Sequence, residues 1–440
     1  MGDKGCDNRQ GSLRAIFTSR FVRNSGTLLS GSMVAQGITF VAYLLLSRLY
    51  LPADFGLYNI FYSYIEVLII LSTCKYEMAI VKADSEAEAA ALTRFSLRLN
   101  AAVSAVILVA TVVLSLLRVE AVPLPPLLLL LIPLMVFFCG TTRVYTFAFD
   151  RYSHFRQIAA AEVVTSLSGT LLKVAFGLLA AVGQLFHLVG LPLGTILGKV
   201  AGNVYYRAGV RRLPSVAPAT PLRPLLRKHR NFPLYSMPRE LVSSFSANLP
   251  FMWLGLYFDK ALLGLFALAY TFTMRPVNIL ANTFEKVFYP SAKEKIDLHQ
   301  PLGRDLGRFL LTLTAVVLPV LLVAFFFAEP LFTFLFGPKW IGTGYYVRCL
   351  VPWIGVLLLT NSLAFVPNVF ATQRTDFLFQ LVQLLFRVAA LAIGLSRGDF
   401  ALAVLCFCAV STAVQLCQLG WYLYQVRQYD KKLKPQHTNS

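Results

Sequence analysis

The sequence predicts an all-α polytopic membrane protein with about twelve transmembrane helices, and two observations support this. Of the 440 residues, 57% are hydrophobic and only 14% are charged, whereas soluble chains carry about 25% charged residues. The apolar residues also form blocks of roughly 20, which is the length that a helix needs to cross the roughly 30 Å hydrocarbon core. Little sequence remains for a soluble domain.

Twelve apolar blocks are predicted as spans, and charged or proline-rich turns separate most of them. The first six cover residues 28–50, 57–74, 96–117, 125–145, 158–181 and 184–206. The second six cover residues 240–258, 261–289, 309–328, 345–370, 377–396 and 400–424. We therefore expect a basic N-terminal segment (1–27), an N-lobe (28–206), a basic linker (207–239), a C-lobe (240–424) and a C-terminal tail (425–440).

The basic residues are distributed unevenly between alternate loops. With the N-terminus inside, 30 of the 40 Lys and Arg fall in inside segments, and six lie outside: Arg48, Arg118, Lys260, Lys339, Arg348 and Arg397. This bias predicts that both termini and the linker are cytoplasmic. The alternation argues against nucleic acid as the reason for the net charge of +19. Anionic head groups would attract the linker. The favoured interpretation, however, is that its basic residues set the topology and that the segment connects the two lobes.

An internal repeat relates the two halves. "GLYNIFYSY" (56–64) resembles "GLFALAYTF" (264–272), and each copy begins the second helix of its half. The match predicts parallel repeats related by an axis along the membrane normal, with a chance match between aromatic-rich helices as the alternative. When the two copies are aligned, Glu66 corresponds to Met274. Arg275 is therefore one residue beyond the position that corresponds to Glu66.

Charged residues within the predicted spans are the candidate site. They comprise four cations and two anions, which are Lys173, Lys199, Arg275, Arg387, Glu66 and Glu162, and Arg48 and Glu240 lie near span ends. Such residues normally face a bundle interior or a wet cavity. An excess of cations suits an anionic passenger, because arginine matches phosphate oxygens bidentately.

Arg275 and Pro276 stand side by side in the eighth span. Two interpretations of Arg275 remain open, namely a buried ion pair with an acid from another helix and a ligand in a substrate cavity. Pro276 favours the second interpretation, because a kinked helix can bend between two states.

Glycine recurs every four residues in the sixth span, at Gly190, Gly194, Gly198 and Gly202. Faces of small residues let helix backbones approach closely. We expect this stripe to pack against a neighbouring helix of the same lobe, with a dimer interface as the alternative.

Enzyme signatures are missing from the sequence. The nearest approach to a phosphate-binding loop, "GTILGKV" (194–200), lacks the required glycine spacing and the hydroxyl residue after lysine. The five histidines show no metal-ligand spacing. The predicted outside loops are too short to hold the acceptor of a glycosyl polymerase. The chain is therefore expected not to be an enzyme and to need no metal or cofactor.

Three stretches resemble bacterial polysaccharide transporters of the O-antigen flippase type. They are "LLLSRLYLPADFGLYNIFYSYIEVLIILSTCKYEMAIVKADS" (44–85), "FPLYSMPRELVSSFSANLPFMWLGLYFDKALLGLFALAYTFTMRPVNILANTFEKVFYPSAKE" (232–294) and "FGPKWIGTGYYVRCLVPWIGVLLLTNSLAFVPNVFATQRTDFLFQLV" (336–382). This family belongs to the multidrug/oligosaccharidyl-lipid/polysaccharide exporter (MOP) superfamily. The resemblance implies two six-helix lobes around a central cavity, alternating access, and a cavity lined by helices one, two, seven and eight, which carry Arg48, Glu66, Glu240 and Arg275.

The resemblance implies a flippase that moves an undecaprenyl-pyrophosphate-linked oligosaccharide to the outer leaflet of the bacterial inner membrane. Arg275, with Arg48 or Arg387, would hold the pyrophosphate, and Lys173 is a further candidate. Glu66, Glu162 and Glu240 are candidates for coupling to protons or sodium ions, or for charge pairing. Membrane lipids, a polysaccharide polymerase and chain-length proteins are the expected partners. A multidrug or cation exporter of the same superfamily and a membrane glycosyl polymerase are the alternatives.

Overall fold

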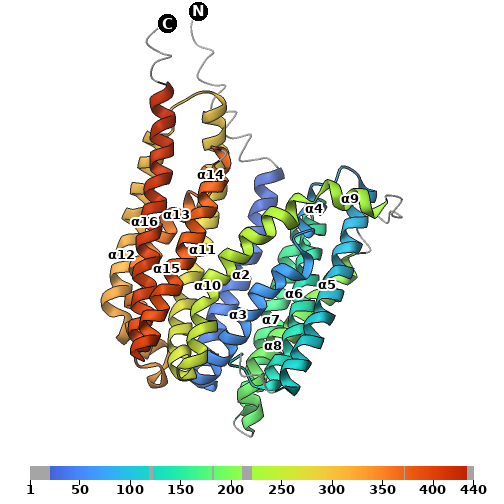
Figure 1. Cartoon of the computed structure of the whole chain (residues 1–440), viewed down its shortest axis with the longest axis vertical. Helices are drawn as coiled ribbons and strands as arrows, with labels where there is room; N and C mark the ends of the chain where they lie inside the picture. The colour runs from blue at the N-terminus through green and yellow to red at the C-terminus, as the bar shows by residue number, and fades with distance from the viewer. Residues whose placement is uncertain (1–19, 118–121, 181–182, 211–220, 371, 434–440) are drawn as a thin grey trace, which may run out of the picture. The chain divides into compact units, whose positions relative to one another are not determined.

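The computed structural model describes residues 20–117, 122–180, 183–210, 221–370 and 372–433 (Figure 1). These ranges contain twelve helices of 20 residues or more and no strand, which confirms the predicted all-α class. Ten of the described helices are long and apolar enough to cross a membrane. The other two long helices are α2 and α10, and they occupy the first and seventh predicted spans.

The chain divides into two compact units, Met1–Tyr50 with Tyr64–Leu241, and Leu51–Ser63 with Val242–Ser440. The sequence predicted lobes that are continuous in the chain, whereas here the chain changes unit three times, once between α2 and α3 and twice inside helices. These helices are α3 (Pro52–Thr73) and α10 (Met237–Tyr257).

Unit 1 contains five of the remaining long helices and two short ones. They are α2 (Arg20–Leu49), α4 (Glu77–Val81), α5 (Glu86–Leu116), α6 (Pro126–Arg151), α7 (Phe155–Ala180), α8 (Gln184–Val210) and α9 (Leu222–Lys228). Helix α5 begins ten residues before its predicted span, because the Ser85 side chain caps it by accepting from the Glu88 N–H. Hydropathy detects only the part of a helix that is apolar, so capped polar turns beyond it are missed.

Unit 2 contains the other long helices. They are α11 (Lys260–Asp297), α12 (Gly303–Phe336), α13 (Thr343–Ser362), α15 (Gln373–Arg397) and α16 (Phe400–Leu433), with the short helix α14 (Val366–Val369) and the 3-10 turn η2 (Pro338–Trp340). Helix α11 runs unbroken through Pro276. Helix α12 exposes a row of large apolar side chains, including Leu311, Val316, Val320 and Phe327. A surface of this kind suits hydrocarbon rather than water.

The glycine stripe of α8 packs against α7 inside unit 1. A Cβ atom at Gly198 would lie 2.7 Å from the Cα atom of Gly169, and one at Gly194 would lie 2.9 Å from the backbone nitrogen of Lys173. These distances are closer than real Cβ atoms come to backbone atoms. The structure therefore confirms packing within the lobe as the role of the stripe.

The repeated glycines meet each other in unit 2, where α3 crosses α11. A Cβ atom at Gly264 would overlap the carbonyl oxygen of Pro52, and one at Gly56 would overlap the carbonyl oxygen of Lys260. Gly264 thus faces Pro52, which is four residues before Gly56. In the same way, Gly56 faces Lys260, which is four residues before Gly264. Equivalent copies of one motif produce this reciprocity, so the crossing supports the repeat predicted from the sequence.

Candidate functional site: charged side chains in the helix bundles

Unit 1 holds most of the charged residues that the sequence singled out. Arg48 is exposed near the end of α2, and Glu66 is exposed on α3. Glu162 and Lys173 are half-buried on α7. Glu240, in the first turn of α10, is the predicted residue that the structure places in a cluster of ion pairs.

In unit 2, Arg275 and Pro276 are exposed on α11, whereas Arg387 is buried on α15. Glu66 and Arg275 belong to different units. Their pairing, and the roles predicted for all of these residues, remain predictions.

The cluster around Glu240 begins where α3 ends. Cys74 and Lys75 have φ angles of 47° and 63°, a left-handed conformation that is uncommon for residues other than glycine. This reversal leads into α4 and places Lys75 and Glu77 in the interior of unit 1, where both are almost completely buried. Successive residues in sparsely populated backbone conformations are typical of sites where the surrounding structure holds them for a function.

Arg143 of α6 lies at the centre of this cluster. Its Nε atom is 2.9 Å from Glu77 Oε1, and its Nη2 atom donates to Glu240 Oε1 at 2.8 Å. The Lys75 ammonium forms an ion pair with the other oxygen of Glu240. Two cations thus balance two carboxylates. This balance is required because burying an unpaired charge costs several kcal/mol.

Sequence reasoning overlooked Lys75, Glu77 and Arg143. Lys75 and Glu77 lie just beyond the second predicted span, and Arg143 lies at the predicted cytoplasmic end of the fourth. The available signal was the presence of complementary charges at the predicted cytoplasmic ends of three different spans.

Arg387 occupies a second polar site, inside unit 2. Its side chain is 4% exposed. Its Nε donates to Ser411 Oγ at 2.9 Å, and its Nη1 donates to Ser246 Oγ at 2.9 Å. The rings of Trp353 and Phe407 lie 5.0 and 4.8 Å from its Cζ atom. Within the described ranges, no carboxylate lies at ion-pairing distance from this guanidinium.

The groups around Arg387 stabilise the positive charge of its guanidinium without neutralising it. Hydroxyl oxygens accept from the guanidinium, and the aromatic faces attract it through their quadrupoles. A lysine could not replace arginine here, because its point charge neither stacks nor donates in a planar fork. Arg387 is therefore held as a fixed cation in the interior of unit 2.

A row of polar residues continues from Arg387 along the contact between α15 and α16. On α15 the row comprises Asp376, Gln380, Gln383 and Arg387, and on α16 it comprises Ser411, Gln415, Gln418 and Tyr422. The spacing puts each set on one helix face. At the far end, Asp376 Oδ1 accepts from the Tyr422 hydroxyl at 2.7 Å and from Gln418 Nε2 at 2.9 Å. This row was not predicted from the sequence, although its alternating spacing of four and three residues on each helix was available as a signal.

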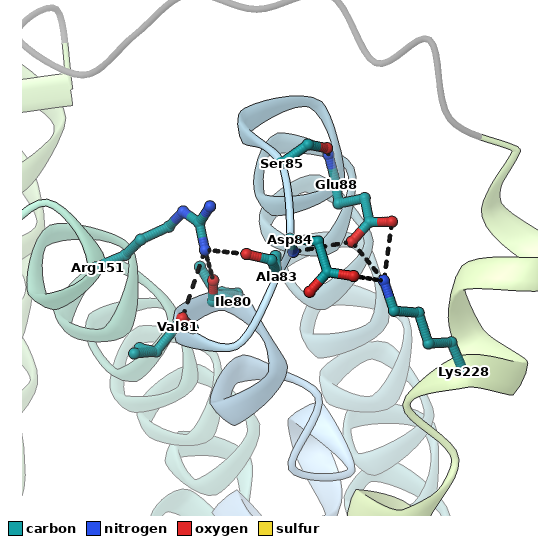
Figure 2. Close-up of polar contacts among 8 residues, drawn as sticks. All are labelled: Ile80, Val81, Ala83, Asp84, Ser85, Glu88, Arg151 and Lys228. Atoms are coloured by element: carbon teal, nitrogen blue, oxygen red, sulfur yellow. Dashed lines mark hydrogen bonds and ion pairs between the residues drawn. The ribbon is translucent and has the colours of Figure 1, made fainter.

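A third charged cluster joins the linker to unit 1. The Lys228 ammonium, at the end of α9, lies 2.7 Å from Asp84 Oδ2 and 2.9 Å from Glu88 Oε2 (Figure 2). Beside it, Arg151 Nη1 donates to the carbonyl oxygens of Ile80 at 3.0 Å and Ala83 at 2.7 Å (Figure 2). Three segments that were predicted to lie on the same side of the membrane therefore meet at one end of unit 1.

The contact between Lys228 and Asp84 should depend on pH. The hydrogen bond from Lys228 lowers the pKa of Asp84 below its ordinary value of 3.8. The carboxylate is the form that pairs, so the contact stabilises the fold above that ordinary value and is lost as the pH falls through the lowered pKa. We expect Lys228→Met to lower the thermal unfolding temperature slightly at neutral pH, since both groups are exposed.

Measured by thermal unfolding in detergent, the difference between Lys228→Met and wild type should be present at pH 7 and should shrink at a pH below the lowered pKa values of Asp84 and Glu88, where both carboxylates are protonated. Lys431→Met is the matched control, because Lys431 is exposed and makes no ion pair with the described residues. A difference that is the same at both pH values would contradict the pairing.

The described residues show no group of three or more His, Cys, Asp or Glu side chains that could hold a metal ion. The sites above offer charged and hydrogen-bonding side chains. They can attract, hold or exclude a charged group, and they can tie helices together.

A family model described as "Polysaccharide biosynthesis protein" matches residues 45–344. The match covers well over half of the sequence, so the chain belongs to this family. No curated protein sequence matches the chain.

Solved transporters of the MOP superfamily share the fold. The lipid II flippase MurJ, in an inward closed conformation, aligns with a TM-score of 0.67 at 10% identity, over 91% of this chain and 90% of that one. An inward-facing multidrug resistance MATE transporter aligns with a TM-score of 0.63 at 13% identity, over 90% and 96%.

A MOP superfamily transporter from Pyrococcus furiosus Vc1 (DSM3638), described as having a binding pocket of reversed polarity, aligns with a TM-score of 0.56 at 16% identity, over 93% and 95%. At such identities the likeness concerns the fold. Together with the family match, it confirms the predicted membership of the polysaccharide transporters of the MOP superfamily. The solved proteins that share this fold are described as transporters and as a flippase.

Proposed function

We propose that this protein is a flippase that moves an undecaprenyl-pyrophosphate-linked oligosaccharide from the cytoplasmic to the outer leaflet by alternating access. The observation that carries the proposal is Arg387, a cation buried in unit 2 and surrounded by neutral groups. A transporter that retains an uncompensated positive charge among its helices suits an anionic passenger. A cation exporter would be expected to carry a negative charge among its helices.

In this proposal Arg275, with Arg48, holds the pyrophosphate through bidentate hydrogen bonds. Both side chains are exposed in their units. Arg387 and Lys173 contribute positive potential, Arg387 from its buried position. The sugars travel in the aqueous part of the pathway, and the lipid tail stays in the bilayer.

The energy for export need not come from ATP. Moving two negative charges outward gains about 2.3 kcal/mol per charge for each 100 mV of membrane potential. Glu66, Glu162 and Glu240 are the proposed residues for coupling to a proton or a sodium ion. Glu240 suits this role because its carboxylate forms ion pairs with both Lys75 and Arg143, with which a proton or a sodium ion could compete.

We further propose that the protein lies in the bacterial inner membrane with both termini in the cytoplasm. It would serve the assembly of O-antigen, capsule or exopolysaccharide, together with a polymerase and chain-length proteins. The meeting of loop 74–85, the turn after Arg151 and α9 at one end of unit 1 supports the alternation of loops on which this topology rests.

The double variant Arg275→Met with Glu66→Met tests the phosphate-binding role. If Arg275 only neutralises Glu66, an apolar pair should replace the ion pair at little cost, and export should be normal. If Arg275 binds pyrophosphate, the variant should reach the membrane in normal amounts and export at least tenfold less glycan.

The measurement is surface polysaccharide in a deletion strain that carries each variant, normalised to the amount of protein in the membrane. The double variant Arg304→Met with Asp297→Met is the matched control, since it removes one exposed charge of each sign outside the predicted spans, and neither side chain forms an ion pair with the described residues. Full export from the Arg275 and Glu66 variant would end the pyrophosphate role of Arg275.

A further inference from the structure

The basic linker contains a folded segment, residues 221–236, that is attached to unit 1. Helix α9 is followed by a turn and by the π-helical turn η1 (Phe232–Ser236), which leads into α10. Leu225 of α9 is buried in an apolar cluster with residues of α4, α5 and α6, among them Ile80, Leu92 and Val144. Phe232 packs against the same cluster. This segment is therefore part of the fold of unit 1 rather than a solvated connection.

The attachment uses only one of the four basic side chains in this segment. Lys228 is neutralised by Asp84 and Glu88. Lys82, which follows α4, lies over the ring of Phe232, with its Nζ atom 5.4 Å from the ring centroid. Residues 221–236 contain no acidic residue. The remaining cations, Arg223, Arg227 and Arg230, are not used to hold the segment in place.

These three arginines are exposed on α9 and on the turn that follows it, and we call their side chains, with the exposed apolar side chains of the same segment, the α9 surface. Arg223, Arg227 and Arg230 are exposed and make no hydrogen bond or ion pair within the described part of the chain. Arg223 and Arg227 are four residues apart in α9, so they lie on one helix face. Apolar side chains that are also exposed accompany them, namely Leu222, Leu234 and Tyr235.

We propose that the α9 surface binds the head groups of anionic phospholipids. Three unpaired arginines beside exposed leucine and tyrosine side chains match a phosphate layer that borders hydrocarbon. Tyr235 precedes the predicted start of the seventh span at residue 240 by five residues, or about 8 Å of helical rise. That depth matches the polar layer on each side of the bilayer, which is about 5–8 Å thick. Tyrosine is enriched at this depth.

A protein partner is the less favoured occupant of this surface. Polybasic segments next to membrane helices gain free energy from the negative surface potential of the cytoplasmic leaflet, equivalent to about fivefold in binding for each arginine. Three arginines would then contribute roughly a hundredfold preference for anionic over zwitterionic lipid. The attachment through Leu225 and Lys228 holds the arginines in position, so little ordering cost is expected on binding.

The experiment compares lipid binding by the purified full-length protein and its variants, and it requires no transport. Native mass spectrometry counts bound phosphatidylglycerol and phosphatidylcholine during titration, and thermal unfolding is measured with each lipid. The test variant combines Arg223→Gln, Arg227→Gln and Arg230→Gln. The control combines Arg156→Gln, Arg304→Gln and Arg308→Gln, which removes three exposed arginines from other predicted cytoplasmic segments.

We expect the wild type and the control to prefer phosphatidylglycerol and to unfold at a higher temperature in its presence. The α9 variant should lose most of that preference and of that stabilisation. A preference that survives in the α9 variant would overturn the proposal. An equal loss in the control would also overturn it, because net charge and not this surface would then be responsible. Absence of any preference in the wild type would instead favour an acidic protein partner.

Discussion

Replacing Gly264 with alanine is expected to abolish export and to destabilise the protein by about 1–3 kcal/mol or more. The new Cβ atom would overlap the carbonyl oxygen of Pro52, which is a backbone atom. No side-chain rotation can relieve that overlap, so α3 and α11 would have to move apart. Gly56→Ala should have the same effect, because its Cβ atom would meet the carbonyl oxygen of Lys260 in the equivalent way.

Gly420→Ala is the matched control, since no atom lies within 4 Å of the position that its Cβ atom would take. An open helical site should gain up to about 1 kcal/mol from this change, because alanine favours helix over glycine. Surface polysaccharide in a complemented deletion strain and thermal unfolding in detergent measure both effects. Normal export and stability in Gly264→Ala would show that the close crossing of α3 and α11 is not required.

Arg143→Leu is the second change with a large expected effect. Glu77 is completely buried, and Arg143 is the cation that contacts it in the described structure. Removing one partner of a buried pair leaves an uncompensated charge and costs about 3–5 kcal/mol. We expect a large loss of folded protein in the membrane and a lower unfolding temperature.

Adding Glu77→Leu should recover most of the stability lost in Arg143→Leu, because apolar residues can replace a buried ion pair at little cost. Lys75 remains paired with Glu240 in this double variant. Arg156→Leu is the control, since Arg156 is exposed and outside the cluster. A double variant no more stable than Arg143→Leu would refute the ion-pair account.

Hydropathy and helix length predicted the long helices well, because each must cover the hydrocarbon core with apolar residues. They could not place the helix ends. Helix α11 extends to Asp297, eight residues beyond its predicted span, since a helix continues beyond the membrane wherever its backbone remains hydrogen-bonded. The membership of residues 51–63 in unit 2 was also unpredictable, because it depends on how closely α3 approaches α11 at Gly56 and Gly264.

The candidate sites were predictable only in part. Composition and position identified Arg387 as a charge within a span, but its surroundings come from distant parts of the chain, such as Ser246 on α10 and Trp353 on α13. The cluster of Lys75, Glu77, Arg143 and Glu240 was missed for the same reason. Pairing between helices is tertiary information, which neither local spacing nor a single sequence contains.

The most direct test of the proposed function is a flipping assay with the purified protein in liposomes that contain an undecaprenyl-pyrophosphate-linked oligosaccharide. A membrane-impermeant glycosidase added outside reports the sugars that have crossed to its side. Without ATP, and with a membrane potential positive on the glycosidase side, the wild type should expose substrate faster than protein-free liposomes, and Arg275→Ala should remove most of that difference. Wild-type liposomes that expose substrate no faster than protein-free ones, while exporting an organic cation, would contradict the account.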